Sequence, residues 1–315
     1  MGYGYGYGYG YGYGYGYGYG YGGGMAGGGV FKNMPAELGL KPWTLDYTPL
    51  PGGAPDLPPP TLPPPTNLDY PHNLWDPALV AGLAATEFAV EAAKWQNLDA
   101  AWLTPNELGW QNTNPGASGF IAAELDKLQT LMSDDRDRYM PEIVAQADSA
   151  PVYWLQLLNV GGGERPGINA LINYAQRIGE MAALFFKERY KRVRPSTLFP
   201  GLLLPFGPPR HPAFPSGHSL TGHLTTYLLC EIPEVNTALS AELVWLADRV
   251  AKNRERAGLH YPSDSAAGKL LAQGIKTALT TPTTAGGINN PTFTKILGAA
   301  KQEAKDLVDP LKQWW

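Results

Sequence analysis

The sequence predicts an all-α protein, a helical bundle that follows a low-complexity N-terminal region. Three observations support this fold class. Apolar residues recur at intervals of three and four along most of the chain after residue 76, which is the spacing of one helix face. Prolines stand where several of these runs begin, and proline suits the first turn of a helix. Alternating runs of β-branched residues, which would indicate strands, are few.

The N-terminal region is expected to contribute no helix. Residues 1–29 alternate Gly and Tyr and then become Gly-rich. Glycine loses the most conformational entropy on ordering, so a disordered tail is expected, with Met25 as an alternative start and self-association as an alternative role. Residues 30–76 are proline-rich in their second half. They are expected to form an extended strap or, alternatively, to bind an SH3-type domain. The helical domain is expected over 77–315.

Hydrophobic spacing divides this domain into eight expected helices. In the fourth, six apolar side chains between Ile168 and Ala182 share one face, which predicts a buried side. Two stretches, 193–215 and 257–264, are expected to be functional loops. The expected helices cover residues 77–95, 118–132, 141–158, 166–192, about 215 to before 233, 235–257, 264–279 and 291–307.

Composition and charge argue against several classes of function. The net charge of -4 provides no field that would attract nucleic acid or an acidic membrane. A single cysteine, Cys230, excludes an internal disulfide and a thiolate metal cage, and it is expected to be a buried, inert thiol. No window reaches ~18 apolar residues without charge, and no secretion signal is visible. We therefore expect no transmembrane segment and a soluble, cytoplasmic protein, with the oligomeric state left open.

The first candidate anion-binding segment lies near the end of the fourth expected helix. Lys187 and Arg194 are seven residues apart, so two helical turns place both on one side. A guanidinium can hold two phosphate oxygens, and an ammonium acts as a compact charge. A basic helix end in solvent is the alternative for this segment, and we assign Arg189, Lys191 and Arg192 to that role.

The second candidate segment is Pro215-Ser216-Gly217-His218, directly before a helical run. Gly217 lets the backbone approach a ligand, and the amides at a helix start together with the Ser216 hydroxyl can form an anion nest. His218 would then stand beside the anion, where it can give or take a proton near neutral pH. An ordinary helix N-cap is the alternative.

The third candidate segment contains Arg254, His260 and Asp264. Arg254 can clamp an oxyanion. A carboxylate bonded to one imidazole nitrogen fixes the tautomer and leaves the other nitrogen available for attack, so Asp264 is expected to orient His260. Asp264 can at the same time act as the N-cap of the next helix.

The remaining histidines differ in their expected roles. His223 is expected to be structural on a helix face, and His72 is expected on the surface. His211 lies seven residues before His218, between two prolines, and is expected at the rim of the pocket.

Together the three segments resemble the signature of the type 2 phosphatidic acid phosphatase and vanadium haloperoxidase superfamily. That signature reads Lys, six residues, Arg-Pro; then Pro-Ser-Gly-His; then Ser-Arg, five residues, His, three residues, Asp. The matching stretches here are 187–195, 215–218 and 253–264, with Asn253 in place of the serine as the one departure. The resemblance implies an α-helical bundle of the acid phosphatase/vanadium haloperoxidase type.

By this resemblance the chain would be a metal-independent phosphomonoester hydrolase, of the acid phosphatase or lipid-phosphate phosphatase type, that needs no cofactor. His260 would form a phosphohistidine, Asp264 would orient it, and His218 would protonate the leaving alcohol and later activate water. The substrate would be a small-molecule or lipid phosphate monoester. The residues implied to bind its phosphate are Lys187, Arg194, Ser216, Gly217 and Arg254.

Two alternatives remain open. In the haloperoxidase branch the same pocket would hold vanadate, with His260 as the vanadium ligand and His218 assisting peroxide binding and halide oxidation. His211 favours this branch, because algal bromoperoxidases also place a histidine seven residues before the Pro-Ser-Gly-His histidine. The run Tyr-Pro-Ser-Asp at 261–264 instead resembles the phosphatase branch. The second alternative is a non-catalytic anion binder or scaffold protein that uses the Gly-Tyr tail and the Pro-rich strap.

Overall fold

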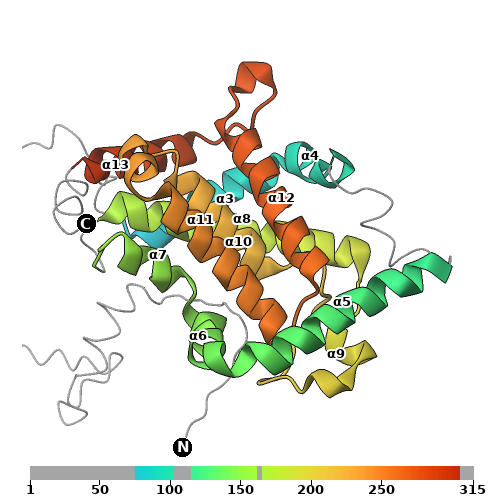
Figure 1. The fold of residues 1–315 in the computed structure, drawn as a ribbon. Helices are drawn as coiled ribbons and strands as arrows, with labels where there is room; N and C mark the ends of the chain where they lie inside the picture. Colours follow the sequence, from blue (N-terminus) through green and yellow to red (C-terminus); the bar gives the residue numbers. More distant parts are fainter. Residues whose placement is uncertain (1–74, 102–114, 162–164, 306–315) are drawn as a thin grey trace, which may run out of the picture.

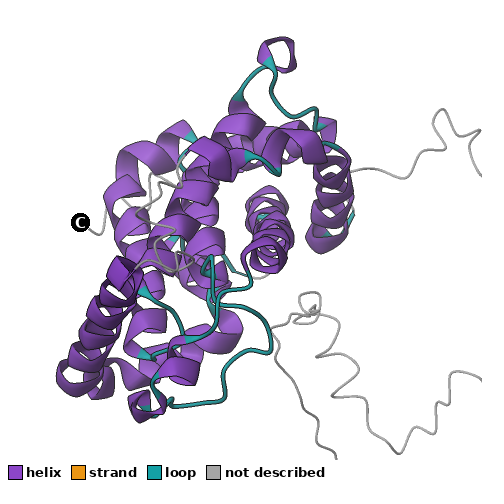
Figure 2. Cartoon of the chain, turned by 90° about the vertical axis from the view of Figure 1, so that its right-hand side faces the viewer, coloured by secondary structure: helices purple, strands orange, loops and turns teal. Residues whose placement is uncertain are grey.

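Helices make up most of the described part of this protein. The computed structural model describes residues 75–101, 115–161 and 165–305. Within those residues no strand occurs (Figure 2), and the predicted all-α fold class is confirmed for them. The predicted N-terminal tail, nearly all of the predicted strap and His72 lie outside the described residues.

Most of the described helices carry a proline in the first turn, where its fixed φ suits the helix. Short 3-10 turns occur at Leu98–Ala101 (η5), Pro200–Leu202 (η7) and Thr283–Ala285 (η8). The α-helices are α3 (Pro77–Val90), α4 (Ala92–Trp95), α5 (Pro115–Asp134), α6 (Arg136–Ser149), α7 (Pro151–Leu157), α8 (Pro166–Tyr190), α9 (Pro195–Leu198), α10 (Gly217–Leu229), α11 (Pro233–Arg256), α12 (Pro262–Thr280) and α13 (Pro291–Ala304).

Two of the expected helices are each divided in two. The helix expected over 77–95 breaks at Glu91, whose ψ of 28° ends α3 before α4 begins. The helix expected over 141–158 starts earlier, contains Pro141 in its interior as α6, and gives way to α7 at Pro151. Proline has no N–H to donate to the preceding turn, so a second proline favours the start of a separate helix.

The end of α8 directs the following segment towards the interior. The helix stops at Tyr190, two residues before the expected end, and Lys191 has a φ of 53°. This left-handed conformation is typical of a helix C-cap and turns the chain sharply. The expected loop over 193–215 contains two short helices, α9 and η7.

The hydrophobic core is built around α8. Helices α3, α10 and α13 pack against it, and α11 and α12 lie beside α10 (Figure 1). The expected buried face between Ile168 and Ala182 is confirmed, since its six apolar side chains are buried. From α7 the buried Trp154 indole donates to Thr226 Oγ1 at 2.9 Å. This core fixes the relative positions of α8, α10 and α12, which carry or adjoin the three candidate segments.

A glycine allows α10 and α12 to approach closely. A Cβ built on Gly268 would lie 2.7 Å from the Ser216 carbonyl oxygen and 2.9 Å from the Leu220 nitrogen. At the same junction the Ser216 amide donates to the Asp264 carbonyl at 2.9 Å. The contact therefore joins the second and third candidate segments.

Replacing Gly268 by Ala is expected to lower the free energy of unfolding by about 1–3 kcal/mol, because backbone atoms of α10 must move. The matched control is Gly298→Ala in α13, where no described atom lies within 4 Å of the added Cβ. The control is expected to gain up to about 1 kcal/mol from better helix propensity. Urea denaturation of both variants measures the difference, and equal effects would contradict the close contact.

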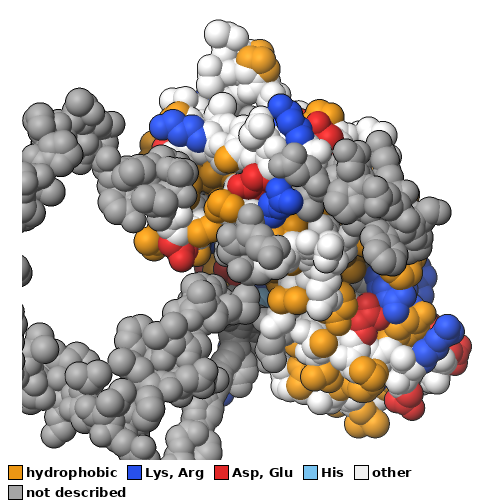
Figure 3. All heavy atoms as spheres, turned by 90° about the vertical axis from the view of Figure 1, so that its left-hand side faces the viewer, with side chains coloured by type: hydrophobic (Ala, Val, Ile, Leu, Met, Phe, Trp, Pro, Cys, Tyr) orange, Lys and Arg blue, Asp and Glu red, His pale blue; other side chains and the backbone are white. Residues whose placement is uncertain are grey.

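The described surface carries apolar side chains among charged ones, as one face in Figure 3 illustrates. Exposed examples are Val90 on α3 and Leu203, which follows η7 and is 74% exposed. Within the described ranges, no helix combines the length and the apolar character needed to cross a membrane.

Candidate functional site

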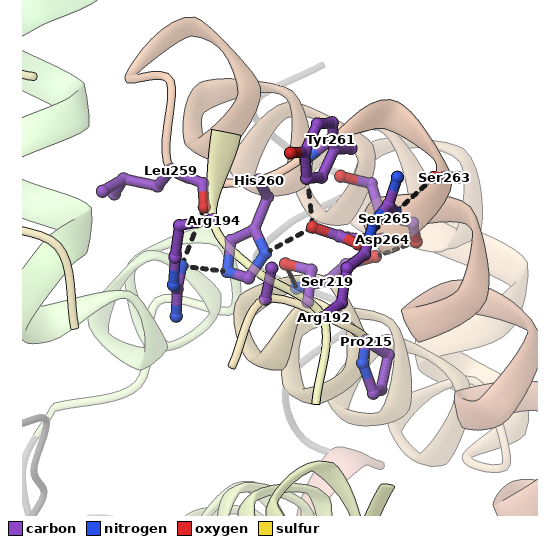
Figure 4. A network of polar contacts seen from close by, with 12 residues as sticks. Arg192, Arg194, Pro215, Ser219, Leu259, His260, Tyr261, Ser263, Asp264 and Ser265 are labelled. Carbon is purple, nitrogen blue, oxygen red and sulfur yellow. Dashed lines mark hydrogen bonds and ion pairs between the residues drawn. The ribbon is translucent and has the colours of Figure 1, made fainter. Parts of the chain in front are cut away.

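His260 and Asp264 form a hydrogen-bonded pair at the start of α12 (Figure 4). The Nδ1 atom of His260 lies 3.1 Å from Asp264 Oδ2, and its Nε2 atom lies 3.2 Å from Nη1 of Arg194. A carboxylate can only accept and a guanidinium can only donate. The neutral ring therefore carries its proton on Nδ1 and its lone pair on Nε2, which is the tautomer expected from the sequence.

The surroundings of His260 favour the neutral imidazole. Burial lowers the pKa of His260 well below its usual value, and the charges of Arg194 and Lys187 lower it further. His211 and His218 act in the same direction. The first two candidate segments and the 193–215 loop thus bring two cations and two histidines within electrostatic range of this ring.

Asp264 is completely buried as the third residue of α12. Its Oδ2 atom also accepts from the Tyr261 amide at 3.0 Å. The prediction that Asp264 is the N-cap of this helix is wrong. Tyr261 is the N-cap, and the Asp264 carboxylate in the first turn accepts from the Tyr261 amide. Gly258, with a φ of 74°, lies in the turn between α11 and α12. A carboxylate is also favoured near the positive end of a helix dipole.

Lys187 holds the loop that precedes α10. Its side chain is 2% exposed, and its ammonium donates to the carbonyl oxygens of Pro212, Ala213 and Pro215 at 2.8, 2.9 and 2.6 Å. These acceptors match the three N–H groups of an ammonium. Burial, followed by the charge of Arg194, lowers the pKa of Lys187 well below its usual value. A direct bond from Lys187 to a phosphate oxygen would therefore replace one of its three carbonyl contacts.

Arg194 and His211 lie against each other. Arg194 Nη1 donates to the Leu259 carbonyl at 2.8 Å, and its Nε donates to the His211 carbonyl at 3.1 Å. Its Nη2 lies 3.1 Å from His211 Nδ1. Burial, followed by the charges of Lys187 and Arg194, lowers the pKa of His211 to about 3. The partly exposed His211 therefore lies directly beside Arg194, and its place at the rim of an anion pocket stays a prediction.

The start of α10 is built from Ser216, Gly217 and His218. Ser216 is the N-cap, and its hydroxyl accepts from the amide three residues on at 3.4 Å. A Cβ added to Gly217 would meet no described atom within 4 Å, so space is left open beside the helix start. His218 Nε2 lies 3.1 Å from the Gln146 carbonyl, which can only accept, so this nitrogen carries a proton. Burial, followed by the charge of Arg254, lowers the pKa of His218 to about 3.

Arg254 and Asn253 anchor the third segment to α6. Arg254 is 1% exposed, and its Nη2 donates to the Ile143 carbonyl at 2.6 Å. Asn253 Nδ2 donates to Gln146 Oε1 at 2.9 Å. The asparagine in place of serine therefore does donate a hydrogen bond. Gln146, which contacts both Asn253 and His218, was not predicted because a single glutamine on a helix carries no sequence signal.

Arg192 is buried, contrary to the expected solvent position. Its Nη1 lies 2.7 Å from Asp264 Oδ1, and its Nη2 lies 2.8 Å from Glu124 Oε2. The prediction placed residue 192 on a solvated helix end, but the helix has already turned at Lys191. Glu124 on α5 was not predicted either, because one carboxylate on an amphipathic helix has no distinguishing pattern.

The other expectations concern residues outside this cluster. Lys191 is exposed, as expected, whereas Arg189 forms an ion pair with Asp99 instead of facing only solvent. His223 is buried with hydrogen-bond partners at both ring nitrogens, which fits the structural role expected for it. Cys230 is partly rather than fully buried, and burial raises the pKa of its thiol.

Comparison with known proteins finds a slight structural likeness to solved structures. No protein-family model and no curated protein matches this chain. Among solved structures, the chain is similar to the first transmembrane PAP2 type phosphatidylglycerolphosphate phosphatase from Bacillus subtilis, with 14% identity and a TM-score of 0.28. The match covers 73% of this chain and 98% of that one.

Proposed function

We propose that this protein is a phosphomonoester hydrolase that works through a phosphohistidine on His260. One observation carries the proposal: Asp264 accepts from Nδ1 of the buried ring, and Nε2 presents its lone pair towards a guanidinium. A neutral, oriented imidazole is a competent nucleophile, and the cation beside its attacking nitrogen would attract the phosphate that it attacks.

The positive charge of the site supports a phosphate substrate. Lys187 and Arg194 come from the first candidate segment and Arg254 from the third, and each is less than a tenth exposed. The charges of Lys187 and Arg194 act on His260, and the charge of Arg254 acts on His218. A phosphoryl group in flight spreads negative charge over its equatorial oxygens, and fixed cations stabilise that charge. The open space beside Gly217 and the helix start would admit one of these oxygens.

The proposed reaction has two steps with balanced protons. The lone pair of His260 Nε2 attacks phosphorus as the bond to the leaving alcohol breaks, and the imidazolium form of His218 gives that alcohol its proton. Neutral His218 then takes a proton from the water that attacks phosphorus as the N–P bond breaks. A bound phosphate would offset the nearby positive charges that lower the pKa of His218, and would so favour the imidazolium needed in the first step.

Hydrolysis of p-nitrophenyl phosphate tests this proposal. His260→Ala is expected to reduce kcat by about 10³-fold or more, because no other group replaces the nucleophile. The matched control is His223→Gln, which removes a buried histidine whose partners are Ser219 and Asp248 and is expected to retain activity. Rapid quenching in base with a radiolabelled phosphomonoester should trap label on the wild type and not on His260→Ala. A folded wild type without phosphate release would overturn the proposal.

A vanadium haloperoxidase is the second candidate, and His211 is the observation that favours it. A third histidine beside Arg194 has no required step in phosphate hydrolysis. Here the same cations would surround vanadate, with His260 as its ligand, and the bound vanadate would supply peroxide activation. Bromination of a dye with peroxide, bromide and added vanadate tests this reading. Vanadate-dependent bromination with feeble phosphate release would favour it, and vanadate inhibition of phosphate release would favour the hydrolase.

A further inference from the structure

A line of five charged or polar side chains runs through the site. From one end it reads Arg194, His260, Asp264, Arg192 and Glu124, and the first four are labelled in Figure 4. Each carboxylate oxygen of Asp264 has its own partner, with His260 on Oδ2 and Arg192 on Oδ1. A rotation of the Asp264 carboxylate would therefore break both contacts.

The backbone explains why one arginine contacts His260 and a second arginine contacts Asp264. After the turn at Lys191 the chain is not helical, and Arg192 and Arg194 are buried while Val193 between them is 49% exposed. In an extended segment, residues two apart point to the same side. One short stretch thus delivers one guanidinium to His260 and another to Asp264.

Arg192 is itself held from two directions. Glu124 Oε2 accepts from Arg192 Nη2 at 2.8 Å, and Glu124 also accepts from the amide and hydroxyl of Ser263 at 2.7 and 2.8 Å. On another side, the guanidinium carbon lies 3.8 Å from the centre of the Tyr261 ring. Arg192 and Glu124 are 3% and 4% exposed, so solvent screens this contact little. The arrangement ties α5 to the first turn of α12.

We propose that Arg192 and Glu124 are positioning residues for the proposed reaction: Arg192 fixes the Asp264 carboxylate against His260, and Glu124 fixes Arg192. The proposal rests on the proposed function. Neither residue acts on the substrate itself. A planar guanidinium suits this role because its donors can hold Asp264, Ser263 and Glu124 in one plane, whereas an ammonium offers only a point charge.

A double-mutant cycle separates positioning from a general structural role. Arg192→Gln is expected to lower kcat for p-nitrophenyl phosphate roughly 10- to 100-fold with little change in KM, because a misaligned nucleophile slows the chemical step. If Arg192 acts through Asp264, the double variant Arg192→Gln with Asp264→Asn should have a kcat little below that of Asp264→Asn alone. Additive losses would overturn the proposal.

The matched control is Arg189→Gln, which removes a guanidinium only three residues away that pairs with Asp99 outside the cluster. It is expected to keep kcat within a few fold of the wild type. Arg192→Lys is expected to recover part of the activity lost in Arg192→Gln, because a cation remains beside Asp264. No recovery, or a loss in Arg189→Gln equal to that in Arg192→Gln, would contradict a positioning role.

A readout without turnover keeps this proposal separate from the proposed function. In ¹⁵N-histidine NMR spectra, His260 of the wild type and of Arg189→Gln should show one tautomer with the proton on Nδ1. Arg192→Gln should show a mixture of tautomers, and Glu124→Gln provides the same test if Arg192→Gln does not fold. An unaltered single tautomer in the folded variant overturns the positioning role even in an active enzyme. A mixture in a protein without phosphatase activity would support positioning while the hydrolase proposal fails.

Discussion

Replacing Lys187 by Met is expected to lower the free energy of unfolding by about 3–5 kcal/mol. The methionine fills similar space but leaves the carbonyl oxygens of Pro212, Ala213 and Pro215 without the donor that now joins them. Buried acceptors that lose a donor each cost about 1–3 kcal/mol before relaxation. The loop that leads into Ser216 should loosen with them.

The same substitution at Lys191 provides the control. That side chain is exposed, and its ion pair with Glu188 lies in solvent, so Lys191→Met is expected to change stability by about 0.5 kcal/mol or less. Urea denaturation at neutral pH measures both variants. A loss below about 1 kcal/mol for Lys187→Met would show that the loop does not depend on the ammonium.

Stability is expected to fall steeply as the pH drops from 6.5 to 4.5. Burial and nearby cations lower the pKa values of His211 and His218 to about 3, and lower that of His260 well below its usual value. Between these values and an unfolded pKa near 6.5, the unfolded chain binds protons that the folded chain does not. The stability these neutral rings contribute is therefore fully present above about pH 6.5 and is lost towards lower pH.

The size of the effect follows from linkage. One such histidine adds up to about 1.4 kcal/mol per pH unit to the slope of the free energy of unfolding against pH. For the partly exposed His211 and His218 we expect about 1 kcal/mol per pH unit each. Urea denaturation at pH 6.5, 5.5 and 4.5 should show a slope that becomes shallower by this amount in His218→Gln and again in His211→Gln. An unchanged slope in both variants would contradict their neutral state in the folded protein.

Local patterns predicted most of the helices but not all of their boundaries. The apolar face of α8 could be predicted because it depends only on spacing within one helix. The breaks at Glu91 and Pro151 were missed because the hydrophobic spacing continues across them. The turn at Lys191 was missed for a related reason, since a left-handed lysine has no composition signal of the kind glycine gives. That one error placed Arg192 in solvent.

The sequence by itself predicted six of the residues in the proposed site. The spacing within its three segments selected Lys187, Arg194, His218, Arg254, His260 and Asp264, because each lies at a helix end or in an adjoining loop whose position the local pattern sets. The tertiary structure alone decided how these groups are held: carbonyl oxygens surround Lys187, Gln146 binds His218, and Arg192 with Glu124 holds Asp264. Such partners come from other helices, and only the packing of the whole bundle decides which buried charge meets which acceptor.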